Sequence, residues 1–182
     1  MLDWNPAAYG ADVARLLALD ALLPLTAGPC SDENARREIA GRSAAEWFPE
    51  ARSRDGALAG LYLYFCCADE AHQIAQSIPT PEGSYWHAIV HRQEPDAANS
   101  RYWFGRTGKH PVFAPLLEQA REIAAAHTGH SWAPPKAWDP SAFIDLCEAA
   151  VRQPGSKLER VALEIQRAEW RLLFDYCARS AA

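Results

Sequence analysis

Apolar residues recur at intervals of three and four along nearly the whole chain, and this spacing limits the possible folds more than any other feature. Leu116, Leu117, Ala120 and Ile123 are one example, and they would share one face of a helix. No segment shows a convincing alternation of apolar and polar residues, which is the pattern of a half-buried strand. The sequence therefore predicts an all-α protein.

Proline and capping residues mark where helices begin and end. Proline follows a capping residue at Thr80-Pro81 and at Asp139-Pro140, and each pair predicts a helix start. A first helix is expected from Asn5 to Pro24, and the last helix is expected to start at Ser156. We predict a single-domain bundle of about seven to nine helices over residues 1–182, with the site-bearing region at about residues 55–127.

The most apolar stretch, residues 57–68, predicts a buried core helix that starts at Asp55. The stretch is too short to span a bilayer, so no membrane association is expected. Beyond Phe65 the same helical stripe continues with Asp69, His72 and Gln76. A stripe that changes from apolar to polar indicates a buried helix that reaches a pocket, and His72 and Gln76 are therefore candidate ligand-binding residues.

Net charge and cysteine usage argue against two classes of protein. The formal charge of −5 argues against a nucleic-acid-binding surface, which is normally basic. The five cysteines are odd in number and include no Cys-x-x-Cys pair, which argues against a structural zinc knuckle. Nothing resembles a signal peptide, so we expect reduced thiols and a cytoplasmic protein. Cys66 and Cys67 fall in the apolar stretch, where burial would raise the pKa of each thiol and make it a poor nucleophile.

The segment from Ser84 to Pro111 carries the strongest functional signal, because it concentrates three His residues with Arg, Lys, acidic and aromatic residues. On a helix, His87, His91 and Glu94 fall at i, i+4 and i+7 and point the same way. Three interpretations stay open at this point. The residues form a solvated polar face, they ligate a divalent metal ion through both imidazoles and the carboxylate, or they bind a ligand or act as acid-base groups without metal.

A second group repeats this spacing on the following helix, where Asn99, Trp103 and Arg106 stand at i, i+4 and i+7. Together with Arg101 they are candidate ligand-binding residues, because a guanidinium group matches a carboxylate or a phosphate. The alternative is structural, with Arg101 or Arg106 in a salt bridge to an acidic residue at the end of the preceding helix.

Two further His residues are candidates for ligand binding. His110 stands beside Lys109 and just before a predicted helix, whose free N–H groups would attract an anion; a plain role near the helix cap is the alternative. His72 ends an apolar stripe, where a satisfied core histidine is the common outcome. The short turn between the helices of His72 and His87 favours antiparallel packing, which would bring the two residues together.

These blocks support a resemblance. Ala71–Gln76, Ser84–Asp96, Ser100–Arg106 and His110–Phe113 resemble a group of bacterial and fungal all-helical proteins of unassigned function, and the His-x3-His-Arg-x-Glu and Tyr-Trp-Phe blocks are the specific parts. The group carries Arg where this chain has Gly105. The resemblance implies that six residues belong together: His72, Gln76, His87, His91, Glu94 and Arg106.

The leading hypothesis is a protein with one polar His/Glu/Arg pocket that binds a small anionic metabolite and acts on it by acid-base chemistry of His87, His91 and Glu94. Arg101, Arg106 and His110 would lie nearby. A second hypothesis is a divalent-metal-dependent hydrolase with His87, His91 and Glu94 as metal ligands. A third is an interaction module with an exposed aromatic surface. The sequence predicts neither the substrate nor the oligomeric state.

Overall fold

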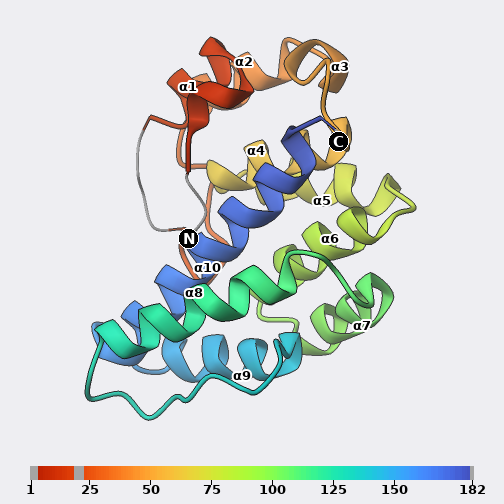
Figure 1. Ribbon diagram of the computed structural model, residues 1–182. Helices are drawn as coiled ribbons and strands as arrows, with labels where there is room; N and C mark the ends of the chain where they lie inside the picture. Colours follow the sequence, from red (N-terminus) through yellow and green to blue (C-terminus); the bar gives the residue numbers. More distant parts are fainter. Residues whose placement is uncertain (1–3, 19–22, 181–182) are drawn as a thin grey trace.

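The computed structural model describes residues 4–18 and 23–180, which are all-α (Figure 1). Over these residues a 3-10 helix, η1 (Pro6–Tyr9), precedes ten α-helices. The α-helices are α1 (Ala11–Leu16), α2 (Glu33–Ala40), α3 (Ala44–Trp47), α4 (Arg54–Tyr64), α5 (Ala68–Ser77), α6 (Pro81–Gln93), α7 (Ala97–Thr107), α8 (Phe113–Ala126), α9 (Pro140–Val151) and α10 (Lys157–Ala178). The predicted all-α class is confirmed.

Eight of the ten described α-helices have seven or more residues, which agrees with the predicted seven to nine, and two of the predicted helices are interrupted. The predicted first helix is η1 followed by α1, separated by Gly10 at φ 98, a backbone conformation that ends a helix. Residues 19–22, which the prediction also placed in this helix, lie outside the described residues. The predicted starts at Asp139 and Ser156 agree with the structure, because each residue caps a helix through its side chain, and Asp96 caps α7 in the same way.

The second interruption divides the predicted central helix. α4 ends at Tyr64 and α5 begins at Ala68, and Cys66 between them has φ 58. A residue in this left-handed region stops helical hydrogen bonding and redirects the chain. The polar stripe with His72 therefore lies on a helix of its own and does not extend the core helix.

The cysteines correct the prediction of reduced thiols. Cys30, in the loop before α2, forms a disulfide with Cys67 at the start of α5. The two residues are 37 positions apart in sequence, so their contact depends on tertiary packing that residue spacing does not reveal. Cys66 is a free thiol whose pKa burial raises. Burial also raises the pKa of the thiols of Cys147 and Cys177 to about 12.

The longest helix, α10, lies in the middle of the molecule and packs against α4, α8 and α9 (Figure 1). Val161, Ile165 and Leu173 form part of its inward stripe, and none of them has exposed surface. Each fully buried aliphatic side chain of this kind contributes about 1.5–3 kcal/mol relative to an exposed one. α10 therefore organises the core on which the other helices are placed.

Gly60 allows α4 and α6 to approach each other closely beside α10. A Cβ atom at this position would lie 2.7 Å from Cζ2 of Trp86 and 3.0 Å from Cδ2 of Phe174. The indole N–H of Trp170 donates to the carbonyl oxygen of Gly60 at 2.9 Å. The small residue thus holds α6 against the core.

The rotation of α6 about its axis is set by a buried polar network. Arg92 forms an ion pair with Glu169 of α10, and the hydroxyl of Tyr85 donates to Glu169 at 3.1 Å. Tyr85 and Arg92 are seven residues apart and share one face of α6, whereas His87 and His91 lie on nearly the opposite face. Because the first face is fixed to α10, the second face turns toward α5.

A tight turn joins α5 to α6. The turn comprises residues 78–80, and Pro81 occupies the first turn of α6 as predicted. Gly83 permits it, since a Cβ atom at Gly83 would lie 2.4 Å from the carbonyl oxygen of Ile78. The backbone of the turn therefore packs directly on α6, and α5 lies alongside α6.

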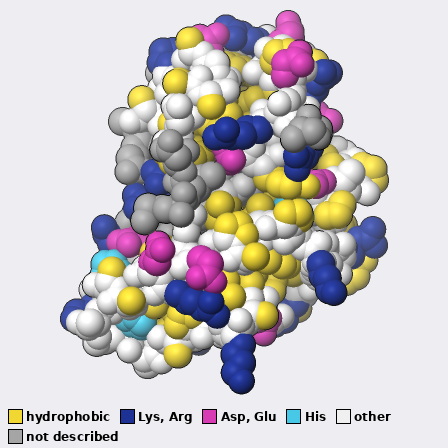
Figure 2. All heavy atoms as spheres, viewed as in Figure 1, with side chains coloured by type: hydrophobic (Ala, Val, Ile, Leu, Met, Phe, Trp, Pro, Cys, Tyr) yellow, Lys and Arg dark blue, Asp and Glu magenta, His cyan; other side chains and the backbone are white. Residues whose placement is uncertain are grey.

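The surface mixes charges of both signs. On the face drawn in Figure 2, Lys and Arg side chains alternate with Asp and Glu side chains around apolar atoms. Among the large apolar side chains of residues 4–18 and 23–180, Tyr102 and Val151 are the exposed ones, at 58% and 42%. Within the same residues, no helix has both the length and the apolar character needed to cross a membrane.

Candidate metal centre

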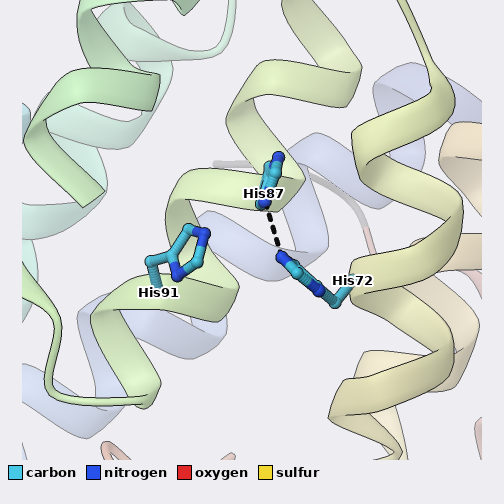
Figure 3. A group of neighbouring side chains, drawn as sticks. All are labelled: His72, His87 and His91. Atoms are coloured by element: carbon cyan, nitrogen blue, oxygen red, sulfur yellow. Dashed lines mark hydrogen bonds between the residues drawn. The ribbon is translucent and has the colours of Figure 1, made fainter. Parts of the chain in front are cut away.

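Three imidazole rings meet between α5 and α6, as Figure 3 shows. His72 comes from α5, and His87 and His91 come from α6. The Nε2 atoms of His72 and His87 lie 2.7 Å apart. Each of the three residues offers one ring nitrogen, and these three atoms lie within 4.8 Å of one another. His72 and His87 are 15 positions apart in sequence and are brought together by the turn between α5 and α6, whereas His87 and His91 are one helical turn apart on α6.

Ring packing fixes the orientation of His87. Its imidazole stacks on Trp103 of α7 at a centroid distance of 4.0 Å and on His91 at 4.7 Å. His72 meets it edge-on, at 4.5 Å. Stacking on both an aromatic side chain and an imidazole leaves the ring little rotational freedom, so Nε2 is held toward α5.

His87 is neutral at physiological pH. Burial, and to a smaller extent the neighbouring His72 and His91, which disfavour an additional positive charge, together lower its pKa to about 4. A neutral imidazole keeps a nitrogen lone pair, which is the form that ligates a metal ion. Nδ1 of His87 is buried and has no hydrogen-bond partner among the described residues.

Two polar side chains orient His91. A carboxylate oxygen of Glu94 lies 2.9 Å from Nδ1, and the amide nitrogen of Asn99 lies 3.1 Å from Nε2. An ionised carboxylate only accepts hydrogen bonds, so Nδ1 carries the proton and Nε2 carries the lone pair. Glu94 therefore acts on His91 from outside the cluster, as carboxylates do toward metal-bound histidines.

The geometry fits a tetrahedral metal ion after small side-chain movements. Zinc–nitrogen distances of about 2.0–2.1 Å place two ligand nitrogens of a tetrahedral site about 3.3 Å apart. One observed separation is 2.7 Å and none within the trio exceeds 4.8 Å, so shifts of about an ångström or two bring the nitrogens to that value. Three imidazoles favour zinc, copper, nickel or iron over magnesium and calcium, which prefer oxygen ligands.

The basic residues predicted for an anion clamp, Arg101 and Arg106, contact residues other than the three histidines. Arg101 pairs with Asp145 of α9 at 2.6 Å. The structural alternative placed Arg101 in a salt bridge with an acidic residue at the end of α6, and its observed partner is a different one. The guanidinium of Arg106 lies 5.4 Å from the ring centroid of Trp103, and the residue is exposed. Gln76 is also exposed, one turn beyond His72 on α5.

His110 occupies a different environment on the far side of α6. Its side chain is 1% exposed and packs against Tyr85 and Tyr176 at centroid distances of 5.2 and 4.9 Å. Nδ1 accepts a hydrogen bond from the backbone of Val112 at 3.3 Å, and Nε2 faces a carboxylate oxygen of Glu82 at 3.8 Å. The imidazole lowers the pKa of Glu82 to about 2, against the opposing effect of burial.

The sequence analysis did not identify the ion pair that sets the rotation of α6, which is formed by Arg92 and Glu169. A basic residue seven positions after Tyr85 and an acidic residue within the apolar stripe of the last helix were the available signals. Neither signal identifies its partner, because the two residues are 77 positions apart.

Comparison with protein-family models, with curated proteins and with solved structures found no match to this chain. The resemblance inferred from the sequence blocks stays a prediction.

Proposed function

We propose that this protein binds one zinc-type divalent metal ion through His72, His87 and His91, and that the bound ion activates a water molecule for hydrolysis. The observation that carries the proposal is the convergence of three imidazole nitrogens within 4.8 Å. Relative to the hypothesis drawn from the sequence, His72 replaces Glu94 as the third ligand.

The number and type of donors support a catalytic ion over a purely structural one. Structural zinc sites have four protein ligands, whereas catalytic sites have three and leave a position for water or substrate. His72 is partly exposed, so water or substrate could reach the fourth coordination position from the α5 side. His91 would ligate through Nε2, after its hydrogen bond from Asn99 is displaced.

The reaction class follows from what such an ion does to water. A bound ion lowers the pKa of its water from about 15.7 to about 7, which produces hydroxide near neutral pH. An ion held by His72, His87 and His91 would thus supply the nucleophile for hydrolysis at an electrophilic carbon or phosphorus atom, and the proton released by the water would be available to the leaving group. Glu94 would position His91 and remain outside the coordination sphere, through the contact at 2.9 Å.

Metal analysis of untagged protein tests the proposal. We expect about one equivalent of zinc or a neighbouring transition metal, lost after chelation, restored on reconstitution and lost in His72→Ala, His87→Ala and His91→Ala. His127→Ala is the matched control, because His127 pairs with Glu164 outside the trio. Cobalt(II) substitution adds a geometric readout, since a tetrahedral site gives strong visible absorption. Metal-free protein that takes up no ion on reconstitution would refute the proposal.

A second candidate function is acid-base chemistry without metal on a small anionic ligand. The His91–Glu94 contact favours it, since a carboxylate that orients an imidazole is the usual support of a general base. Arg101 is paired with Asp145, and Arg106 lies over the ring of Trp103, so neither contact supports an anion clamp at this site. An exposed aromatic interaction surface is also unsupported, with Tyr102 the one exposed large aromatic residue of the described chain.

A further inference from the structure

A second cavity, outside the histidine trio, lies beside the start of α8 and the connection between α8 and α9. Its volume is about 390 Å³, at the lower end of the range of about 300–1,000 Å³ for small-molecule sites. Phe113, Leu117 and Trp138 supply most of its apolar wall, and Lys109, Lys136 and the buried His110 also line it. The cavity therefore combines an apolar body with cations.

The charge of the lining has one sign. Lys109 and Lys136 line the cavity and no Asp or Glu does, among the residues that the structure describes. Neither ammonium group has an ion-pair partner within 4.0 Å in the described part of the chain, although most Arg side chains there are paired. Two unpaired cations over one apolar cavity attract an anion.

One buried hydrogen-bonding group of the lining residues is also unsatisfied. The indole N–H of Trp138 has no acceptor among the described residues. The other buried polar side chain of the lining, His110, faces the carboxylate of Glu82 through Nε2 at 3.8 Å and is not needed for the ligand. An unsatisfied buried donor costs free energy, which a ligand oxygen would recover.

We propose that this cavity binds a small monocarboxylate with an aromatic or branched apolar body. The carboxylate would lie between Lys109 and Lys136 and accept from Trp138, and the apolar body would contact Phe113 and Leu117. Inorganic phosphate fits less well, because it would leave the apolar wall without a contact. The proposal does not depend on the metal centre, which draws on other residues.

Titration with sodium phenylacetate tests the site, followed through the indole resonances in ¹H–¹⁵N NMR spectra. Phenylacetate should shift the Trp138 resonance saturably, and Trp138→Phe identifies that resonance. Phenylacetamide, which has the same body without the charge, should bind roughly tenfold or more weakly, as should phenylacetate to the double variant Lys109→Gln/Lys136→Gln. Both lysines are exposed, so the double variant is expected to fold.

The control is Arg37→Gln/Arg160→Gln, which removes the same charge from exposed positions outside the cavity. It should bind phenylacetate like the unmodified protein, and so should His72→Ala, which separates this site from the metal centre. Three results would each overturn the proposal: no saturable shift of Trp138, equal binding of the acid and the amide, or equal weakening in the control double variant.

Discussion

The Nε2 atoms of His72 and His87 lie 2.7 Å apart, although the two residues belong to different helices. Two imidazole nitrogens at this distance share at most one proton, and an ion between them would link α5 to α6. The link would join a helix fixed to the core through Arg92 to one held by a short turn and a disulfide. Metal binding would therefore be coupled to the stability of the α5–α6 pair.

We accordingly expect zinc to raise the melting temperature. A ligand at 100 times its dissociation constant stabilises the native state by about 2.7 kcal/mol, which corresponds to roughly 5–10 °C for a chain of this size. The comparison is differential scanning fluorimetry of chelator-treated protein with and without zinc. His91→Ala should abolish the zinc-dependent increase and His127→Ala should preserve it. An increase that persists in His91→Ala would place the ion elsewhere.

Glu94→Gln should weaken metal binding without abolishing it. The amide keeps the size of the side chain but loses the charge that holds the proton on Nδ1 of His91, 2.9 Å away. Losses of this kind are about 10–100-fold in affinity. Competition with a chromogenic chelator measures the change, and Glu118→Gln on α8 removes an exposed carboxylate as the control. Complete loss of the ion would instead make Glu94 a ligand.

The free energy of unfolding should depend strongly on keeping Arg92 and Glu169 paired. Their side chains are 1% and 0% exposed, so Glu169→Gln leaves a buried guanidinium without its counter-ion. Breaking such a pair costs about 3–5 kcal/mol, whereas replacing both partners by Met costs much less. Urea unfolding of the single and double variants measures this difference. Equal destabilisation by the single and double variants would show that the cost does not come from a buried charge left without its partner.

Gly60→Ala and Gly105→Ala should change stability in opposite directions. A methyl group at Gly60 meets the rigid rings of Trp86 and Phe174 at 2.7 and 3.0 Å, and overpacking of this kind costs about 1–3 kcal/mol. Gly105 lies in α7 with nothing within 4 Å of its Cβ position, so alanine there should add about 0.5–1 kcal/mol by helix propensity. Denaturant midpoints of the two variants report both signs.

Local chemistry was sufficient to predict much of the fold. Capping by Asp139 and Ser156 is a property of residues close in sequence, and the structure confirms it. The left-handed conformation of Cys66 was not predictable, because the sequence around it has full helical periodicity and neither Gly nor Pro. Tertiary packing overrides helix propensity at that point.

The candidate site was predictable in part for the same reason. The spacing of His87 and His91 places them on one helical face whatever surrounds them, so their proximity follows from the sequence alone. The contact with His72 depends on the turn, on Gly83 and on the rotation of α6 fixed by Glu169 of another helix. The partner of Arg101, Asp145, is likewise 44 positions away, and local spacing gave no sign of it.

Glu82 should contribute to the loss of stability in acid. The imidazole of His110, 3.8 Å away, lowers the pKa of Glu82 from 4.5 to about 2, and the hydroxyl of Thr80 acts in the same direction. A carboxyl whose pKa is lower in the folded state stabilises the protein fully above the unfolded value. That contribution is lost as pH falls from about 4.5 to about 2, because the unfolded chain takes up the proton first.

Glu82→Gln removes this titration, and the effect can be followed in urea melts between pH 7 and pH 2. The variant should be less stable than the unmodified protein at pH 7, and the two should converge as the pH approaches 2. Glu122→Gln, which removes an exposed carboxylate of α8, is the control for net charge. Because Glu82 faces His110 and the thiol of Cys177, with no metal-site residue in that group, chelator should leave the difference unchanged. A constant difference across the pH range would show that Glu82 acts through packing instead of charge.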